Sequence, residues 1–210
     1  SGRALVQAAR QLPAGQSGHL VVDLFHGMQD NPDTPTRVSD AELRIVDERT
    51  LTGGRRVHEW ANGRTIHFAM KLSRPFARAQ IYSDDRPLPR TAREARGSKL
   101  KTVLHYPDAH DGPLLVKVGI SAVSAEGALR NLDADIPDWD FARVRNAAVA
   151  AWERELSRVR ISTPSERHKR IFYTAMYHTL LAPTLFSDVD GQYRGMDLKV
   201  HTLPKGQHNY

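Results

Sequence analysis

Hydrophobic and polar residues follow two different patterns along the chain, and the change occurs near Ser124. Before Ser124, short apolar runs alternate with turn-forming residues, which is typical of β-strands joined by tight loops. After it, apolar residues recur at steps of three and four, which is the spacing of an amphipathic helix. Strands in series without helices between them predict an antiparallel β-sandwich. The predicted fold class is therefore mixed, β then α.

The strand predictions rest on local patterns of apolar residues. The run 19–25 is apolar and β-branched, as in a buried strand, whereas 41–46 alternates apolar and charged residues, as in a strand with one exposed face. Asn62 and Gly63 predict a hairpin, because both central positions of a type I′ turn need positive φ. The segment 52–55 (Thr-Gly-Gly-Arg) is interpreted as a turn. Strands are predicted over 19–25, 41–46, 56–60, 65–72, 77–82, 99–106 and 114–123.

The helical half begins with a run from Ala125 that can start a helix. A longer helix is predicted over 140–160, with Asp138 as its N-cap, because the apolar residues there share one face. Trp152 lies on that face and is interpreted as a core residue rather than a platform for a ligand. We expect this helix to link the sandwich to a following domain.

A further helix is predicted over 166–181. Ser165 is its predicted N-cap, Glu166 suits the positive end of the helix dipole, and Pro183 ends the helix. We expect this helix to pack on the preceding one and to leave an exposed apolar patch, because nothing else in the chain covers it. No terminating element follows before Tyr210, so we expect the chain to be a fragment cut at both ends.

Composition is that of an ordinary globular protein. The chain has 210 residues, of which 40% are hydrophobic and 26% charged, so it can bury at least one core. No run approaches the roughly 18 apolar residues of a membrane span, and any export signal is expected upstream of Ser1. The chain has no cysteine, which excludes disulfides and thiolate metal sites.

The net charge of +6 raises nucleic-acid binding as an alternative function. The basic residues are scattered among acidic ones, however, and the one dense patch, Arg86 to Lys101, contains proline and glycine like a surface loop. Binding through that patch predicts an affinity that falls steeply with salt. We expect no nucleic-acid partner.

A polar loop after Pro183 contains the candidate chemistry. Arg194 and Asp197 flank a glycine, Gly195, and together could hold a sugar or phosphate by charge-assisted hydrogen bonds. The same spacing also fits a tight turn with an internal Arg–Asp pair. Spacing alone leaves both interpretations open.

Other chemistries find little support in the sequence. Asp188 and Asp190 lie in a glycine-flanked turn that does not raise a carboxyl pKa, so they are interpreted as structural or solvated. With Asp188 as the first residue of an EF-hand loop, Lys199 would occupy the closing position, where an acidic ligand is required. His168 and His178 do not have the spacing of a zinc motif.

Residues on both sides of Pro183 carry a family resemblance. They are Phe172-Tyr-Thr-Ala-Met-Tyr-His-Thr179 before the proline, then Phe186-Ser-Asp-Val-Asp-Gly-Gln-Tyr-Arg-Gly-Met-Asp197 and Val200-His201. Together they resemble glycoside hydrolase family 92, which consists of calcium-dependent exo-acting α-mannosidases. The runs Leu20-Val-Val-Asp-Leu24 and Ser73-Arg-Pro-Phe76, with Trp60, are similar to parts of the family's N-terminal β-domain.

The resemblance implies an N-terminal β-sandwich followed by an (α/α)6 barrel. On that basis we predict an incomplete sandwich over 1–124, a helical linker over 125–162 and the truncated start of the catalytic barrel over 163–210. The implied activity is removal of terminal α-linked mannose, with α-1,2 linkages, inversion and calcium dependence expected, from mannose-containing glycans. The alternative is a non-catalytic carbohydrate-binding β-sandwich with a helical extension.

The resemblance also assigns roles to residues. Arg194 and Asp197, with Tyr193 behind them, are predicted to bind substrate at the sugar-binding face of the barrel. The catalytic acid and base and the Ca²⁺ ligands are implied to lie downstream of Tyr210, so no catalytic or metal-binding residue is assigned and the fragment alone is expected to be inactive. A periplasmic or secreted protein is implied, with a cytoplasmic location still open.

Overall fold

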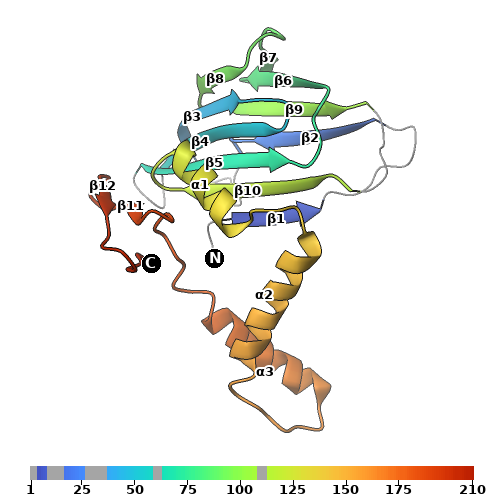
Figure 1. Cartoon of the computed structure of the whole chain (residues 1–210), viewed down its shortest axis with the longest axis vertical. Helices are drawn as coiled ribbons and strands as arrows, with labels where there is room; N and C mark the ends of the chain where they lie inside the picture. Colours follow the sequence, from blue (N-terminus) through green and yellow to red (C-terminus); the bar gives the residue numbers. More distant parts are fainter. Residues whose placement is uncertain (1–3, 9–16, 27–36, 59–62, 108–112) are drawn as a thin grey trace.

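The computed structural model describes residues 4–8, 17–26, 37–58, 63–107 and 113–210, and shows two antiparallel sheets followed by helices (Figure 1). The larger sheet has the strand order β1-β10-β5-β4-β3-β8 and the smaller one β2-β9-β6-β7. The strands are β1 (Ala4–Ala8), β2 (Gly18–Asp23), β3 (Arg37–Ile45), β4 (Thr50–His58), β5 (Arg64–Leu72), β6 (Arg78–Ser83), β7 (Arg86–Pro87), β8 (Glu94–Gly97), β9 (Leu100–Tyr106) and β10 (Leu115–Ser121). The predicted antiparallel sandwich is confirmed.

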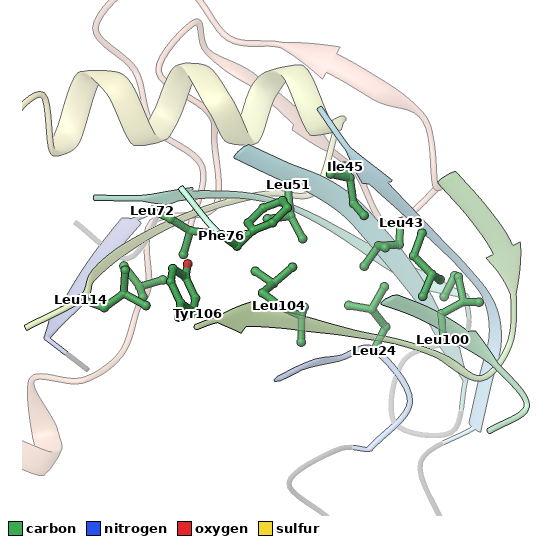
Figure 2. Close-up of a cluster of buried hydrophobic side chains, with 14 of the residues drawn as sticks. Leu24, Leu43, Ile45, Leu51, Leu72, Phe76, Leu100, Leu104, Tyr106 and Leu114 are labelled. Atoms are coloured by element: carbon green, nitrogen blue, oxygen red, sulfur yellow. The ribbon is translucent and has the colours of Figure 1, made fainter. Parts of the chain in front are cut away.

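The core lies between the two sheets and follows the alternation seen in the sequence (Figure 2). In β9, Leu100, Thr102, Leu104 and Tyr106 are buried, while the residues between them face outward and are only half-buried. This is the period of two expected for a strand with one face on a core. The buried cluster contains Val22, Leu24, Val38, Ala41, Leu43, Ile45, Leu51, Leu72, Phe76, Ile81, Leu100, Leu104, Tyr106, Leu114 and Val116.

The predicted turn over 52–55 is wrong, because these residues lie inside β4. The glycines there serve close packing instead. A Cβ atom on Gly53 would lie 2.3 Å from the backbone oxygen of Glu42 and 2.8 Å from the Phe68 ring. The neighbouring strands therefore exclude any side chain at Gly53, and no turn is involved. The chain turns earlier, where the Val46 amide donates to the Thr50 carbonyl at 2.9 Å.

The predicted hairpin between β4 and β5 is confirmed by their pairing, which reaches Val57 opposite Arg64. Gly63 has a φ of 73°, as the turn prediction requires. Asn62 and Trp60 lie outside the described residues.

Helix α1 (Ala125–Asp135) confirms the helix predicted from Ala125 and packs on the outer face of the larger sheet (Figure 1). The Ser124 hydroxyl accepts a hydrogen bond from the Gly127 amide at 3.0 Å and so caps the helix. The helix lies very close to β10, since a Cβ on Gly119 would be 2.3 Å from the Ala128 carbonyl oxygen. Glycine at this position allows the helix to approach the strand.

Lys117 fastens the end of α1 to the sheet. Its ammonium donates to the Ile136 carbonyl at 2.8 Å and lies 4.5 Å from the centre of the Trp139 ring, which is a cation–π contact. Burial is the largest cause of the lowered pKa of this lysine, and the nearby Lys71 adds to it. The charge is buried but satisfied by these partners, so it serves the structure.

Helix α2 (Phe141–Leu156) begins at a different cap from the one predicted. Asp140, not Asp138, is the N-cap, because its carboxylate accepts from the Arg143 amide at 2.8 Å. Asp138 accepts instead from the Asp140 amide at 3.0 Å and pairs with the Arg143 side chain. The helix also ends at Leu156, short of the predicted end at residue 160.

Helix α3 (Glu166–Thr179) has the predicted N-cap, Ser165, whose hydroxyl accepts from the His168 amide at 3.3 Å. It packs on α2 through Trp152 and Tyr177, whose ring centres are 4.5 Å apart. Neither helix contains a buried residue, and Trp152, interpreted as core, is only half-buried. Ile171 stays 55% exposed, so the predicted apolar patch is confirmed. The pair extends away from the sandwich (Figure 1).

Candidate functional site

The run Tyr193-Arg-Gly-Met-Asp197 forms part of a small hairpin rather than an irregular loop. Strand β11 (Gln192–Arg194) pairs antiparallel with β12 (Val200–Thr202), which places Tyr193 opposite His201. The turn between them is closed by the Gly195 amide, which donates to the Lys199 carbonyl at 2.9 Å. The hairpin lies near α1 (Figure 1).

Arg194 is directed toward the sandwich. Its Nε donates to the Ala122 carbonyl at 2.8 Å and its Nη2 to the Val123 carbonyl at 3.2 Å, both in the connection between β10 and α1. Its Nη1 donates to the Leu198 carbonyl at 2.7 Å, within the turn of the hairpin itself. The guanidinium therefore joins the turn to the end of the larger sheet.

Asp197 lies on the exposed side of the same turn and pairs with His201. The His201 Nε2 is 3.0 Å from both carboxylate oxygens of Asp197, and the Lys199 amide donates to one of them at 3.0 Å. The hydrogen bond from His201 is the largest cause of the lowered pKa of Asp197. Tyr193 stacks near His201, with ring centres 5.5 Å apart.

The alternative of an internal Arg–Asp pair does not describe this turn. Arg194 contacts backbone carbonyls and Asp197 contacts His201 and the Lys199 amide, so the two charges have different partners. Asp197 is 47% exposed and its ion-pair partner His201 42% exposed, so both can be reached by a ligand. Substrate binding by Arg194, Asp197 and Tyr193 stays a prediction.

Asp188 is buried, and so is structural rather than solvated. Its carboxylate accepts from the Ser121 hydroxyl at 2.6 Å and from the Asn131 amide nitrogen at 2.8 Å. The Asn131 amide oxygen in turn accepts from the Val189 amide at 2.9 Å. Sequence reasoning missed Ser121 and Asn131, because they lie 67 and 57 positions away from Asp188 and carry no motif.

Asp190 faces solvent at the rim of the same junction. It pairs with Arg130 of α1 at 2.8 Å and accepts from the Gln192 amide at 3.1 Å. Asp188 and Asp190 thus have separate partners and form no acid–base pair. Both carboxylates are engaged by protein donors, and across the described ranges no group of three or more His, Asp or Glu side chains could hold a metal ion. The described acidic side chains therefore do not by themselves fit a calcium site.

The basic patch over 86–101 is partly neutralised by local ion pairs. Arg93 pairs with Glu48 at 3.2 Å and Arg96 with Glu42 at 3.0 Å. Lys101 pairs with Asp85 at 2.8 Å, and Lys99 contacts the other oxygen of that carboxylate. The hydrogen bond from Lys101, followed by that from Lys99, lowers the pKa of Asp85 to about 2. These pairs weaken the interpretation as a polyanion site.

The hairpin makes a pH-dependent contact that can be measured. Because its pKa is lowered, Asp197 stays ionised and bound to His201 at and above its ordinary pKa of 3.8, and the contact is lost as pH falls through the lowered value. A carboxyl-carbon NMR titration is expected to place the midpoint below 3.8. In His201→Phe the midpoint is expected to move upward; an unchanged midpoint would contradict the assigned cause.

The sandwich and the segment that follows it match two domains of one protein family. Residues 9–121 match the glycosyl hydrolase family 92 N-terminal domain, and residues 127–210 match the glycosyl hydrolase family 92 catalytic domain. The chain belongs to glycoside hydrolase family 92. The predicted family is thereby confirmed, whereas the predicted linker over 125–162 stays a prediction.

Solved structures of family 92 proteins superpose closely on the chain. A family 92 α-mannosidase from Bacteroides thetaiotaomicron matches all of it with a TM-score of 0.88 and 27% identity, and its complex with mannoimidazole matches with a TM-score of 0.87. A further family 92 glycosyl hydrolase, ccman5, matches all of it with a TM-score of 0.82 and 26% identity.

An inverting family 92 mannosidase from the same Bacteroides species shares the fold, with a TM-score of 0.81 over 96% of this chain at 22% identity. The chain spans 28% of the length of the first of these structures and 26–27% of the others. No curated protein matches it.

In the described parts of the chain, no helix is long and apolar enough to cross a membrane.

Proposed function

We propose that this family 92 chain is part of an exo-acting α-mannosidase that removes terminal α-1,2-linked mannose from glycans with inversion and with a need for Ca²⁺. The observation that carries the proposal is the exposed Asp197–His201 pair, which lies in a chain that aligns over its whole length with an α-mannosidase solved with mannoimidazole. Mannose presents several hydroxyl groups, and a carboxylate held ionised is a strong acceptor for them.

The residues of the hairpin divide the work of binding. Asp197 offers carboxylate oxygens to sugar hydroxyls, and the hydrogen bond from His201, which lowers its pKa, keeps it ionised into more acidic solution than an ordinary aspartate. Tyr193 adds an aromatic ring beside it, and Arg194 supports the turn from behind. We propose that Asp197 and Tyr193 form one wall of the mannose site and that Arg194 supports this wall from the side of the sandwich.

The reaction also needs a catalytic acid, a catalytic base and Ca²⁺ ligands, which we place outside this segment. Inversion requires an acid to protonate the leaving oxygen and a base to activate water, with carboxyl groups roughly 6.5–9.5 Å apart. We propose that both, together with the Ca²⁺ ligands, lie in the remainder of the catalytic domain. The hairpin described here binds and orients the sugar, and carries no proton in the reaction.

Kinetics of the full-length enzyme on an α-1,2-linked mannobioside test this function. Asp197→Ala is expected to lower kcat/KM by on the order of 100-fold, because a charged acceptor for a sugar hydroxyl contributes up to about 3 kcal/mol. Asp190→Ala is the matched control, since that carboxylate is on the rim of the junction and pairs with Arg130. We expect it to change kcat/KM by less than about 2-fold.

Two further measurements complete this test. Proton NMR of the first product is expected to show β-mannose, the inverted anomer, and a chelator is expected to abolish turnover that added Ca²⁺ restores. No turnover of any α-mannoside by the full-length enzyme would overturn the proposed activity. Unchanged turnover and affinity after alanine substitution of both Arg194 and Asp197 would remove the hairpin from the substrate site.

A further inference from the structure

The junction between the hairpin and the sandwich is built from polar groups with specific partners. Two side chains of the 187–202 segment, Arg194 and Asp188, reach the β10–α1 region and are satisfied there by hydrogen bonds. Apolar contact alone would allow the segment to slide, whereas hydrogen bonds with fixed directions define one position. The geometry of this junction therefore sets where the hairpin lies relative to the sandwich.

Arg194 is suited to this role by the shape of its guanidinium. Three of its nitrogens each donate to a different carbonyl, at distances from 2.7 to 3.2 Å. The Ala122 and Val123 carbonyls follow β10, where the pairing of that strand has ended at Ser121. Lysine carries its charge at a single nitrogen without the rigid fork, so it cannot reproduce this arrangement.

The carbonyl of Leu198 connects Arg194 to the substrate residue. Leu198 follows Asp197 directly, has a φ of 63°, and donates its amide to the Gly195 carbonyl at 2.9 Å. A left-handed conformation in a non-glycine residue is costly and persists where neighbouring contacts enforce it. Arg194 supplies such a contact at 2.7 Å, and thus holds the turn that presents Asp197.

Asp188 forms the second anchor, at the start of the segment. Its carboxylate fits tightly against the first turn of α1, where a Cβ on Gly127 would lie within 2.4 Å of Oδ2. Asn131 binds both the carboxylate of Asp188 and the amide of Val189, so α1 contacts the side chain and the backbone of the segment together. Asp188 and Arg194 therefore both hold the hairpin to the sandwich, inside the rim where Asp190 pairs with Arg130.

We propose that Arg194 is a positioning residue that does not contact the sugar, and that it acts through Asp197 by locking the hairpin turn onto the β10–α1 connection. The proposal rests on the proposed function, because it takes Asp197 as the sugar-binding group. The N-terminal sandwich then contributes to the substrate site through two backbone carbonyls, although none of its side chains need reach the sugar.

A double-mutant cycle in the full-length enzyme tests this role. Arg194→Met and Arg194→Lys are each expected to lower kcat/KM for the mannobioside by on the order of 10-fold to 100-fold, since small displacements of a substrate-binding group have effects of this size. In an Asp197→Ala background, Arg194→Met is expected to add less than about 2-fold, because its effect is transmitted through the missing carboxylate. Additive losses would overturn the proposal and indicate direct sugar contact.

Hydrogen exchange provides a readout that does not depend on activity. Arg194→Met is expected to speed exchange at the amides of Gly195 and Leu198, which close the turn, while amides in β9 stay protected. Arg130→Met is the matched control: it removes another arginine of the same junction, but one whose pair with Asp190 lies at the rim. In this variant, the exchange rates in the turn and kcat/KM are expected to stay within about 2-fold of the values for the unmodified enzyme.

The two readouts separate the possible failures. Unchanged exchange in Arg194→Met, with a large loss of turnover in Asp197→Ala, would overturn the positioning role and leave the proposed function standing. Faster exchange in Arg194→Met, with normal turnover in Asp197→Ala, would overturn the substrate role of the hairpin and leave its anchoring by Arg194 supported.

Discussion

Replacement of Leu104 by alanine is expected to lower the free energy of unfolding of the sandwich by about 3 kcal/mol. Leu104 is fully buried at the centre of β9 and faces the larger sheet (Figure 2). Truncation removes the burial of its side chain and leaves a cavity that the two sheets, held by their strand pairing, cannot close. The loss should appear in the opening free energy of β9 amides, measured by hydrogen exchange in the full-length protein.

Val21→Ala is the control for this effect. Val21 lies in the neighbouring strand β2, but it is 56% exposed and faces away from the core. Its truncation is expected to change the same opening free energy by less than about 0.5 kcal/mol. Equal losses from Leu104→Ala and Val21→Ala would show that the interior of the sandwich is not where the structure places it.

Replacement of Asp188 by alanine is expected to destabilise the junction between the sandwich and the hairpin by about 3 kcal/mol. Asp188 is 3% exposed, and its removal leaves the Ser121 hydroxyl and the Asn131 amide nitrogen without their carboxylate acceptor in a buried site. Unsatisfied buried donors carry their full desolvation cost. Hydrogen exchange at amides of α1 and of the 187–202 segment would report the loss.

Asp190→Ala provides the comparison on the same segment. That carboxylate is exposed and pairs with Arg130, and exposed ion pairs contribute from about 0 to 1 kcal/mol. Asp188→Asn is expected to fall between the two, because the amide keeps one acceptor oxygen but loses the charge. If Asp188→Ala proves no more damaging than Asp190→Ala, the buried network does not hold the junction.

Local pattern was sufficient to predict most of the secondary structure. The alternation along β9 and the helical spacing in α3 involve residues within a few positions of one another, and the Ser165 cap lies directly before its helix. The errors have the same local origin. Gly53 resembles a turn residue in sequence, but its lack of a side chain is used for packing against Glu42 and Phe68 on the neighbouring strands.

The family could also be recognised from sequence, because Tyr193-Arg-Gly-Met-Asp197 and the helix before Pro183 are contiguous runs. The hydrogen-bond partners of these residues could not be predicted from sequence. Arg194 bonds to Ala122 and Val123, which are 72 and 71 positions away. Burial is the largest cause of the lowered pKa of His67, and the charge of Arg194 adds to it. No periodicity or spacing connects positions so far apart.

The sequence by itself determined that this chain is a sandwich followed by helices, and which hairpin residues are candidates for sugar binding, because strand alternation, helix caps and contiguous motifs are local properties. Only the tertiary structure decided that Asp188 is a buried anchor and that Arg194 is directed toward the sandwich. Those roles depend on which groups the packing of α1 on β10 brings within hydrogen-bond distance, and that packing is set by the whole core rather than by any one segment.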